Sequence, residues 1–178
     1  MRLLVVFVAV VMAMLAVSLQ TAFAQGAARV TGGGTGTFNA DLDGDGDIDG
    51  SQFGLGVTIH EGGSARGHFN CVMAGRSDIL GLALMSVAGK VSGGNIDPDG
   101  SATFNGTGTV KAIAPGGDPQ ILTDVPFVVT VTAGGPGVGS LTLTVIGAFD
   151  GVPGDTIAGN GNYDLPTETV TSGRIDIR

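Results

Sequence analysis

Hydrophobic and polar residues alternate one by one along most of the chain after residue 25. In segment 53–60, Phe, Leu, Val and Ile at odd positions alternate with Gly, Thr and His at even positions. A period of two, rich in Val and Thr, is typical of antiparallel strands that bury one face. No window of about a dozen residues keeps a helical stripe. The best helix candidate is one or two turns at 77–84. The pattern therefore predicts an all-β fold.

Turn sequences such as Gly-Gly, Pro-Asp-Gly and Gly-Pro-Gly separate these alternating segments. They predict about eight strands, at residues 28–38, 51–61, 64–74, 82–92, 101–113, 121–133, 139–148 and 168–177. Short connections favour a meander, either closed into a barrel or folded as a sandwich, and the pattern does not separate the two. Glycines within strands, as at 32–36, predict strong local bends.

The first 24 residues do not share this pattern. A basic residue at position 2 precedes an apolar run from Leu3 to Leu19, and an Ala-x-Ala sequence follows at 22–24. These features predict a secretory signal peptide, residues 1–24, that is removed on export. An uncleaved membrane anchor is the alternative, but the run is at the short limit of the roughly 17–25 residues that span a bilayer. We expect residues 25–178 to be a single all-β domain, secreted or in the cell envelope (periplasmic or extracellular), without stable membrane insertion.

The net charge excludes one class of partner, and the cysteine count limits the disulfide chemistry. The chain has 8 Lys and Arg against 16 Asp and Glu, a net charge of −8, which argues against nucleic acid as a partner. The single cysteine, Cys71, excludes an internal disulfide framework. Cys71 shares a strand face with Phe69 and Met73, which predicts a buried, inert thiol, whereas His68 points to the opposite face. An intermolecular disulfide or a reactive thiol would require exposure.

One segment, 41–52, follows the twelve-residue calcium loop of EF-hands. Acidic residues occupy alternate positions, and Gly46 stands at the sixth position, where the chain must turn sharply around the ion. The predicted calcium ligands are Asp41, Asp43, Asp45, Asp47 (through its backbone carbonyl), Asp49 and Gln52. Five acids in nine residues repel one another, and a bound divalent cation offsets that repulsion. The alternative is an acidic, solvated turn without an ion.

The loop departs from a true EF-hand in two ways. Gln52 offers one neutral amide oxygen at the position where EF-hands have a bidentate Glu. The flanking residues alternate as strands rather than forming helices. We therefore expect a structural Ca²⁺ site between two strands, with a weak dissociation constant of about 10⁻⁴–10⁻³ M. Another acidic residue, such as Asp150 or Asp155, is a candidate for a missing ligand.

The sequence offers little catalytic chemistry. It has no zinc-type spacing of His and Cys and no Gly-x-Ser-x-Gly motif, so we predict no catalytic residues and no enzymatic activity. Two pairs remain open as hypotheses. His60 and His68 flank a Gly-Gly turn and could bind a metal or move a proton, although exposed polar residues are the simpler interpretation. Glu61 and Glu168 are a candidate carboxylate pair for a hydrolase.

Four segments, 65–70, 102–110, 127–146 and 172–177, resemble small secreted bacterial β-domains found after choice-of-anchor modules. The 41–52 loop is similar to the calcium loops of dockerin repeats and stands as an insertion in such a domain. The resemblance implies an exported bacterial all-β domain, alone or appended to a surface protein, with no established catalytic residues to carry over.

Together these observations predict a secreted, calcium-binding β-domain that serves as a non-catalytic structural or interaction module of the bacterial envelope or extracellular space. Its partner would be an unidentified protein or surface. The first alternative is a barrel of about eight strands that carries a small apolar ligand in its interior. The second is a carboxylate-dependent hydrolase.

Overall fold

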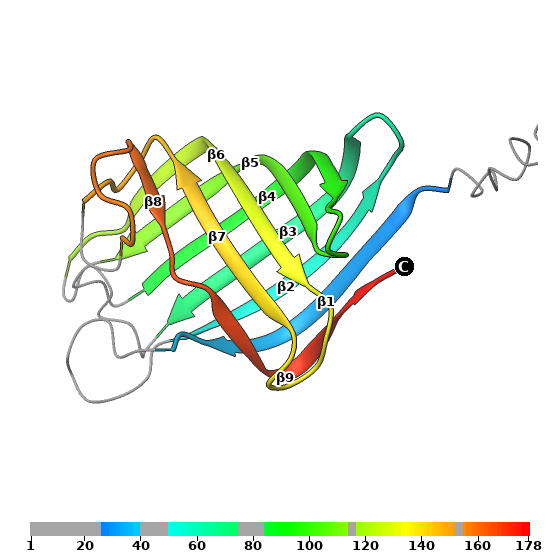
Figure 1. The fold of residues 1–178 in the computed structure, drawn as a ribbon. Coiled ribbons are helices and arrows are strands. Elements are labelled where there is room, and N and C mark those ends of the chain that lie inside the picture. The colour runs from blue at the N-terminus through cyan, green and yellow to red at the C-terminus, as the bar shows by residue number, and fades with distance from the viewer. Residues whose placement is uncertain (1–25, 40–49, 75–83, 114–116, 152–154) are drawn as a thin grey trace, which may run out of the picture.

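A computed structural model describes residues 26–39, 50–74, 84–113, 117–151 and 155–178, which form one antiparallel sheet (Figure 1). Its strands are β1 (Ala28–Thr37), β2 (Gly50–Ile59), β3 (Ser64–Ala74), β4 (Leu84–Ile96), β5 (Ala102–Ile113), β6 (Gln120–Thr132), β7 (Ser140–Ile146), β8 (Asn162–Asp164) and β9 (Glu168–Ile177). The predicted all-β fold is therefore confirmed. Of the candidate helix at 77–84, Leu84 begins β4 and the other residues lie outside the described part of the chain.

The strand pairings close on themselves. Consecutive strands pair from β1 to β7, β7 pairs with β9, and β9 returns to β1. One edge of β7 is shared, because β9 pairs with Ser140 and Leu141 whereas β8 pairs with residues 144–146. The arrangement is a single ring of strands rather than two stacked sheets. Figure 1 shows two ends of this ring. At the loop end β1 ends and β2 begins; at the terminal end β1 begins and β9 ends.

The predicted strand positions agree closely with the observed ones, with two differences. The short strand β8 was not predicted. It is separated from β9 by Pro166, which has no backbone N–H to continue a ladder. Strand β4 continues beyond its predicted end, because Gly93 and Gly94, which were expected to form a turn, pair with Asn105 and Phe104 of β5. The predicted turn at 98–100 is present, with Gly100 at φ 86°.

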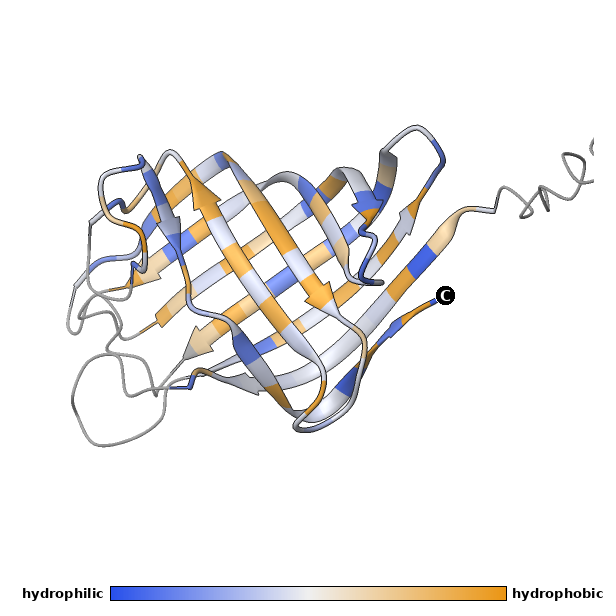
Figure 2. Cartoon of the chain, viewed as in Figure 1, coloured by the Kyte–Doolittle hydropathy of each residue, from blue (hydrophilic) through white to orange (hydrophobic). Residues whose placement is uncertain are grey.

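Apolar side chains from alternate strand positions form a buried core inside the ring. Figure 2 shows hydrophobic and hydrophilic residues alternating along the strands. Phe69 of β3 lies between two other rings, with its centroid 6.0 Å from that of Phe104 and 5.6 Å from that of Phe127. These three residues come from three different strands and are buried. They join strands β3, β5 and β6 through one aromatic cluster, and burial of such apolar area is the main stabilising term of the fold.

Gly89 makes the aromatic cluster possible. It pairs with Phe69 on one side and with Gly108 on the other. A Cβ atom on Gly89 would lie 2.5 Å from Cε1 of Phe127. The Phe127 ring therefore packs directly against the glycine backbone, an arrangement in which an aromatic side chain covers a strand position that has no side chain of its own.

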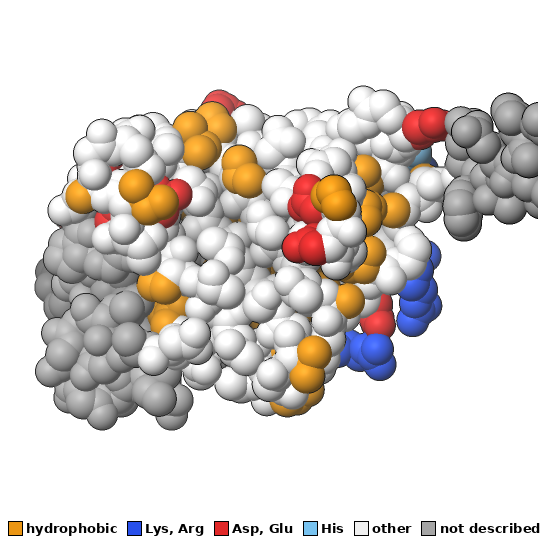
Figure 3. Space-filling view, in the orientation of Figure 1, with side chains coloured by type: hydrophobic (Ala, Val, Ile, Leu, Met, Phe, Trp, Pro, Cys, Tyr) orange, Lys and Arg blue, Asp and Glu red, His pale blue; other side chains and the backbone are white. Residues whose placement is uncertain are grey.

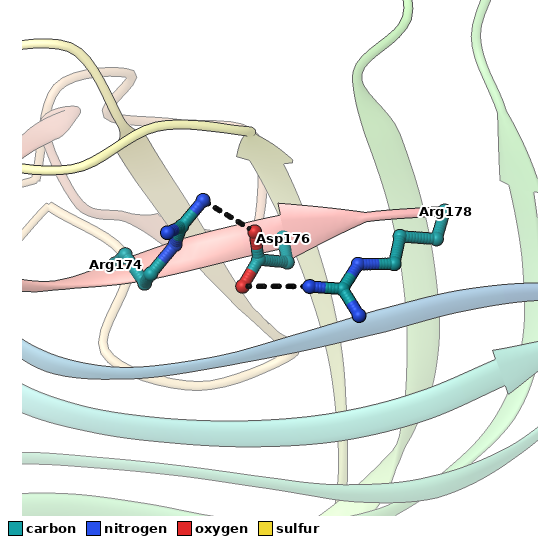
Figure 4. A network of polar contacts seen from close by, with 3 residues as sticks. All are labelled: Arg174, Asp176 and Arg178. Carbon is teal, nitrogen blue, oxygen red and sulfur yellow. Dashed lines mark ion pairs between the residues drawn. The ribbon is translucent and has the colours of Figure 1, made fainter.

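Basic residues gather at the terminal end. Figure 4 shows Asp176 between Arg174 and Arg178, with N–O distances of 2.7 and 3.9 Å. Both guanidinium groups are largely exposed, so these ion pairs contribute little to stability. In the described residues there is no helix long and apolar enough to cross a membrane.

Candidate functional site

The predicted calcium loop is the connection between β1 and β2. Thr37, at the end of β1, pairs with Gly50, at the start of β2, so both ends of the connection are held by the sheet. The flanks are strands, as predicted. The predicted ligands Asp41, Asp43, Asp45, Asp47 and Asp49 lie outside the described residues.

Gln52, the remaining predicted ligand, is the third residue of β2. It pairs with Thr35 of β1 and Val72 of β3, and its side chain is exposed on the outer face of the ring. Its neighbour Ser51 points to the interior instead, because side chains alternate along a strand. Gln52 can therefore contribute only to a metal site on the outer face of the ring.

A buried polar pair lies inside the ring, near the loop end. The Ser51 hydroxyl donates a hydrogen bond to Oε2 of Glu168 with an O–O distance of 2.6 Å. The exposed fraction is 5% for Ser51 and 2% for Glu168. Ser51 lies on β2 and Glu168 on β9, and β1 runs between these two strands. The pair thus ties together two strands that are not neighbours in the sheet.

Gly36 of β1 leaves the space that this pair occupies. A Cβ atom at Gly36 would lie 2.5 Å from Oε2 of Glu168. Near this point the β1–β9 register shifts between Thr35 and Gly36, so that Thr171 is left without a partner in the ladder. This bulge keeps both Val170 and Ile175 directed inward, on either side of the irregularity.

Burial governs the protonation of this cluster. Desolvation raises the pKa of Glu168 to about 7, and the hydrogen bonds from Ser51 oppose the rise only in part. Cys71, the predicted buried thiol, is a free cysteine with no exposed surface, which confirms that prediction. Its pKa is raised far above the usual range, first by burial and then by the charge of Glu168. His68 is exposed on the opposite face, so these two side chains form no dyad.

The register separates the two histidines that were considered as a metal or proton-transfer pair. His68 of β3 lies opposite Gly56 of β2, whereas His60 follows the last residue of β2, Ile59. The two histidines are therefore offset by four residues along the strands, roughly 13 Å.

The two glutamates that were considered as a hydrolase pair are also far apart. Glu61 lies in the β2–β3 turn at the terminal end, and Glu168 begins β9 near the loop end. The structure thus brings neither candidate pair together.

Asp150 and Asp155, the candidates for an additional calcium ligand, organise their own loop. Asp150 accepts hydrogen bonds from the backbone N–H groups of Gly159 and Gly161, at 2.7 and 3.0 Å. Asp155 accepts hydrogen bonds from three backbone N–H groups, those of residues 151, 157 and 164, and these bonds keep its pKa below the usual value. Both carboxylates therefore already serve as structural caps of the loop between β7 and β8.

Comparison of the chain with known protein families, characterised proteins and solved structures finds no match. Within the ranges that the structure describes, no group of three or more His, Cys, Asp or Glu is placed to hold a metal ion.

Sequence reasoning missed the Ser51–Glu168 pair, although a signal was present. Ser51 occupies the same strand phase as the buried Phe53, and Glu168 occupies the same phase as the buried Val170. A polar residue in the apolar phase of a strand predicts a buried polar group, and such groups need hydrogen-bond partners. Which partner each one meets depends on the β1–β9 pairing, which joins the two ends of the domain.

Proposed function

We propose that the chain is an exported, calcium-binding β-domain that acts as a non-catalytic structural or interaction module at the bacterial envelope or outside the cell. The observation that carries the proposal is the pairing of Thr37 with Gly50, which closes the β1–β2 connection at its base. That connection holds five aspartates in nine residues, 41–49. Closing it confines their charges to one short loop.

The closed base gives calcium an energetic role. Confined carboxylates repel one another, and a divalent cation bound between them removes the repulsion. A cation that binds the folded chain better than the unfolded chain stabilises the fold by mass action. Affinities of about 10⁻⁴–10⁻³ M are typical of extracellular calcium modules, so the site would serve a structural purpose at a steady calcium level.

The filled interior favours the module over a ligand carrier. The Phe69 ring contacts the rings of Phe104 and Phe127 inside the ring of strands, in space that a carried apolar ligand would need. The resemblance to secreted bacterial β-domains found after choice-of-anchor modules belongs to the same proposal. It supplies the expectation that the domain stands on, or is released from, a bacterial surface.

Thermal unfolding of residues 25–178 tests the calcium site. We expect the midpoint to be higher in millimolar Ca²⁺ than in EGTA, with little effect of Mg²⁺. Asp43→Ala and Asp45→Ala should each abolish the gain while leaving the far-ultraviolet circular dichroism unchanged. Asp118→Ala, which removes an exposed acid outside the loop, is the matched control and should keep the gain.

Two results would contradict the proposed calcium role. One is an equal shift with Ca²⁺ and Mg²⁺, which would indicate general screening of charge. The other is an undiminished Ca²⁺ shift in Asp43→Ala and Asp45→Ala, which would place the ion elsewhere.

A further inference from the structure

Strand β6 is only half covered by its neighbours. It pairs with β5 from Gln120 to Val131, but with β7 only from Phe127 to Thr132. Gly147, directly after β7, adopts a left-handed conformation with φ 73°, and the later strand β8 pairs with the other edge of β7. Among the described residues, positions 120–126 of β6 therefore have no strand partner on the β7 side. An unpaired strand edge is a common site of association with another chain.

The uncovered half of β6 is apolar. Ile121 is 59% exposed and Leu122 is 39% exposed. Both line a groove of about 650 Å³, together with β6 residues up to Pro126 and with residues 146–148 at the end of β7. Figure 3 shows hydrophobic side chains beside an acidic one near the bend of β6 that Figure 1 displays. Exposed apolar side chains that line a groove are typical of an interaction site.

The backbone of this edge disfavours a continuous ladder with any added strand, so an occupant must be held by side-chain contacts in the groove. The β5–β6 register shifts between Gly108 and Val110, and in this region Asp124 has φ 57°. Pro126 has no N–H group. A bulge and a proline are the devices by which natural edge strands avoid edge-to-edge association. Two copies meeting here would also bring their Asp124 carboxylates together within a chain of net charge −8.

Charge around the groove indicates what kind of segment fits it. Asp124 lines the groove. It is the one acidic residue among those that line the groove. Lys111, opposite Ile121 in β5, is the nearest cation on the paired strand. An apolar groove with one exposed carboxylate in its lining matches a partner that presents apolar side chains next to a lysine or arginine.

We propose that the groove between the first half of β6 and the end of β7 binds an extended segment of a partner protein, with apolar side chains against Ile121 and Leu122 and a cationic side chain beside Asp124. This inference rests on the proposed role as an interaction module and specifies its partner's chemistry. Because the side chains of the groove lie outside the 41–52 loop, its failure would be distinguishable from failure of the calcium site.

Fluorescence anisotropy with two synthetic peptides tests the proposal. The first peptide alternates Val with Lys, and the second alternates Val with Glu at the same length. Residues 25–178 in millimolar Ca²⁺ should bind the Lys peptide at least tenfold more tightly than the Glu peptide. Ile121→Ser should weaken binding of the Lys peptide about fivefold or more. Asp124→Asn, which suits a left-handed backbone, should reduce the preference for Lys over Glu.

Val138→Ser is the matched control, because Val138 is 70% exposed in the β6–β7 turn and does not line the groove. It should bind like the wild type. Three results would overturn the proposal. They are equal affinity for both peptides, no binding at millimolar peptide, and equal losses of Lys-peptide affinity in Ile121→Ser and Val138→Ser. So would a dimer in sedimentation that Ile121→Ser dissociates, since the occupant would then be a second copy. Each variant should keep the calcium-dependent midpoint shift, which shows that it folds and that the calcium site is separate.

Discussion

Ser51 donates its hydroxyl hydrogen to Glu168 across the backbone of Gly36, with 2.6 Å between the two oxygens. The bond links β2 to β9 over the strand between them, close to the point where the ring of strands closes. It also places a carboxyl group in an interior that is mostly apolar. A group in this position makes the stability of the fold depend on pH.

Glu168→Gln should remove part of the pH dependence of unfolding. The pKa of Glu168 is raised from 4.5 to about 7 by burial, so the folded chain holds this proton more tightly than the unfolded chain. The stability that it contributes is fully present below about pH 4.5 and is lost as the pH rises to about 7. Glutamine keeps an acceptor for Ser51 without a charge. The free energy of unfolding of the variant should therefore rise relative to that of the wild type as the pH increases, by roughly 3 kcal/mol at most.

Urea unfolding of both proteins at pH 5 and pH 8, in EGTA, measures this difference. EGTA removes any contribution of bound calcium, and taking the difference between the two proteins cancels the other carboxylates. Parallel stability profiles for variant and wild type would show that Glu168 titrates normally. Titration of the Glu168 carboxyl by NMR gives its pKa directly.

Ser51→Ala should destabilise the fold, and more so at high pH. Removing the hydroxyl leaves Oε2 of Glu168 without this donor, and a hydrogen bond to a charged group contributes about 1.5–3 kcal/mol. We expect a loss near 1 kcal/mol at pH 5, where Glu168 is neutral, and about twice that at pH 8. In a Glu168→Gln background the loss should no longer depend on pH. A loss that is the same at both pH values in the wild-type background would argue that Ser51 acts only through packing.

Gly89→Ala should disturb the aromatic cluster. Its Cβ would lie 2.5 Å from Phe127 Cε1 and 2.5 Å from the Thr107 carbonyl oxygen, which is too close for either neighbour to stay in place. We expect a loss of about 1–3 kcal/mol, measured as a lower denaturant midpoint with an unchanged slope.

Gly56→Ala is the control for that substitution. Gly56 also lies within a strand, but a Cβ there would meet no atom within 4 Å. Alanine should be neutral or slightly stabilising at this position, because it restricts the unfolded chain. Equal losses at Gly56 and Gly89 would mean that any residue larger than glycine weakens these strands, whatever lies above them.

Much of the fold was predictable because a period of two is a local property. The residues on the inward face of β2 can be read from the order of Phe53, Leu55, Val57 and Ile59 alone, and all four are buried. Features that depend on distant pairing were not predictable. Closure of the ring needs β1 to meet β9, and the continuation of β4 through Gly93 needs its partner in β5.

The candidate site shows the same division between local and long-range information. The calcium loop is a contiguous motif, so its residues could be proposed from spacing alone, and strands on both sides of it were expected. The Ser51–Glu168 pair joins residues that are 117 positions apart, and no local pattern relates them. The groove beside Ile121 arises because β7 is shorter than β6, a difference in length that appears only once the strands are paired.

Cys71 should be unreactive in the folded protein and reactive only after unfolding. Its side chain has no exposed surface, and burial raises its pKa, so the thiolate that attacks disulfide reagents is both inaccessible and disfavoured. In native buffer at pH 8, a chromogenic disulfide reagent should label the chain no faster than the chain unfolds. In guanidinium chloride it should label one thiol per chain rapidly, because Cys71 is the single cysteine. Cys71→Ala supplies the background signal. Rapid labelling of the native chain, or a disulfide-linked dimer on a non-reducing gel, would instead favour the exposed, reactive thiol that burial argues against.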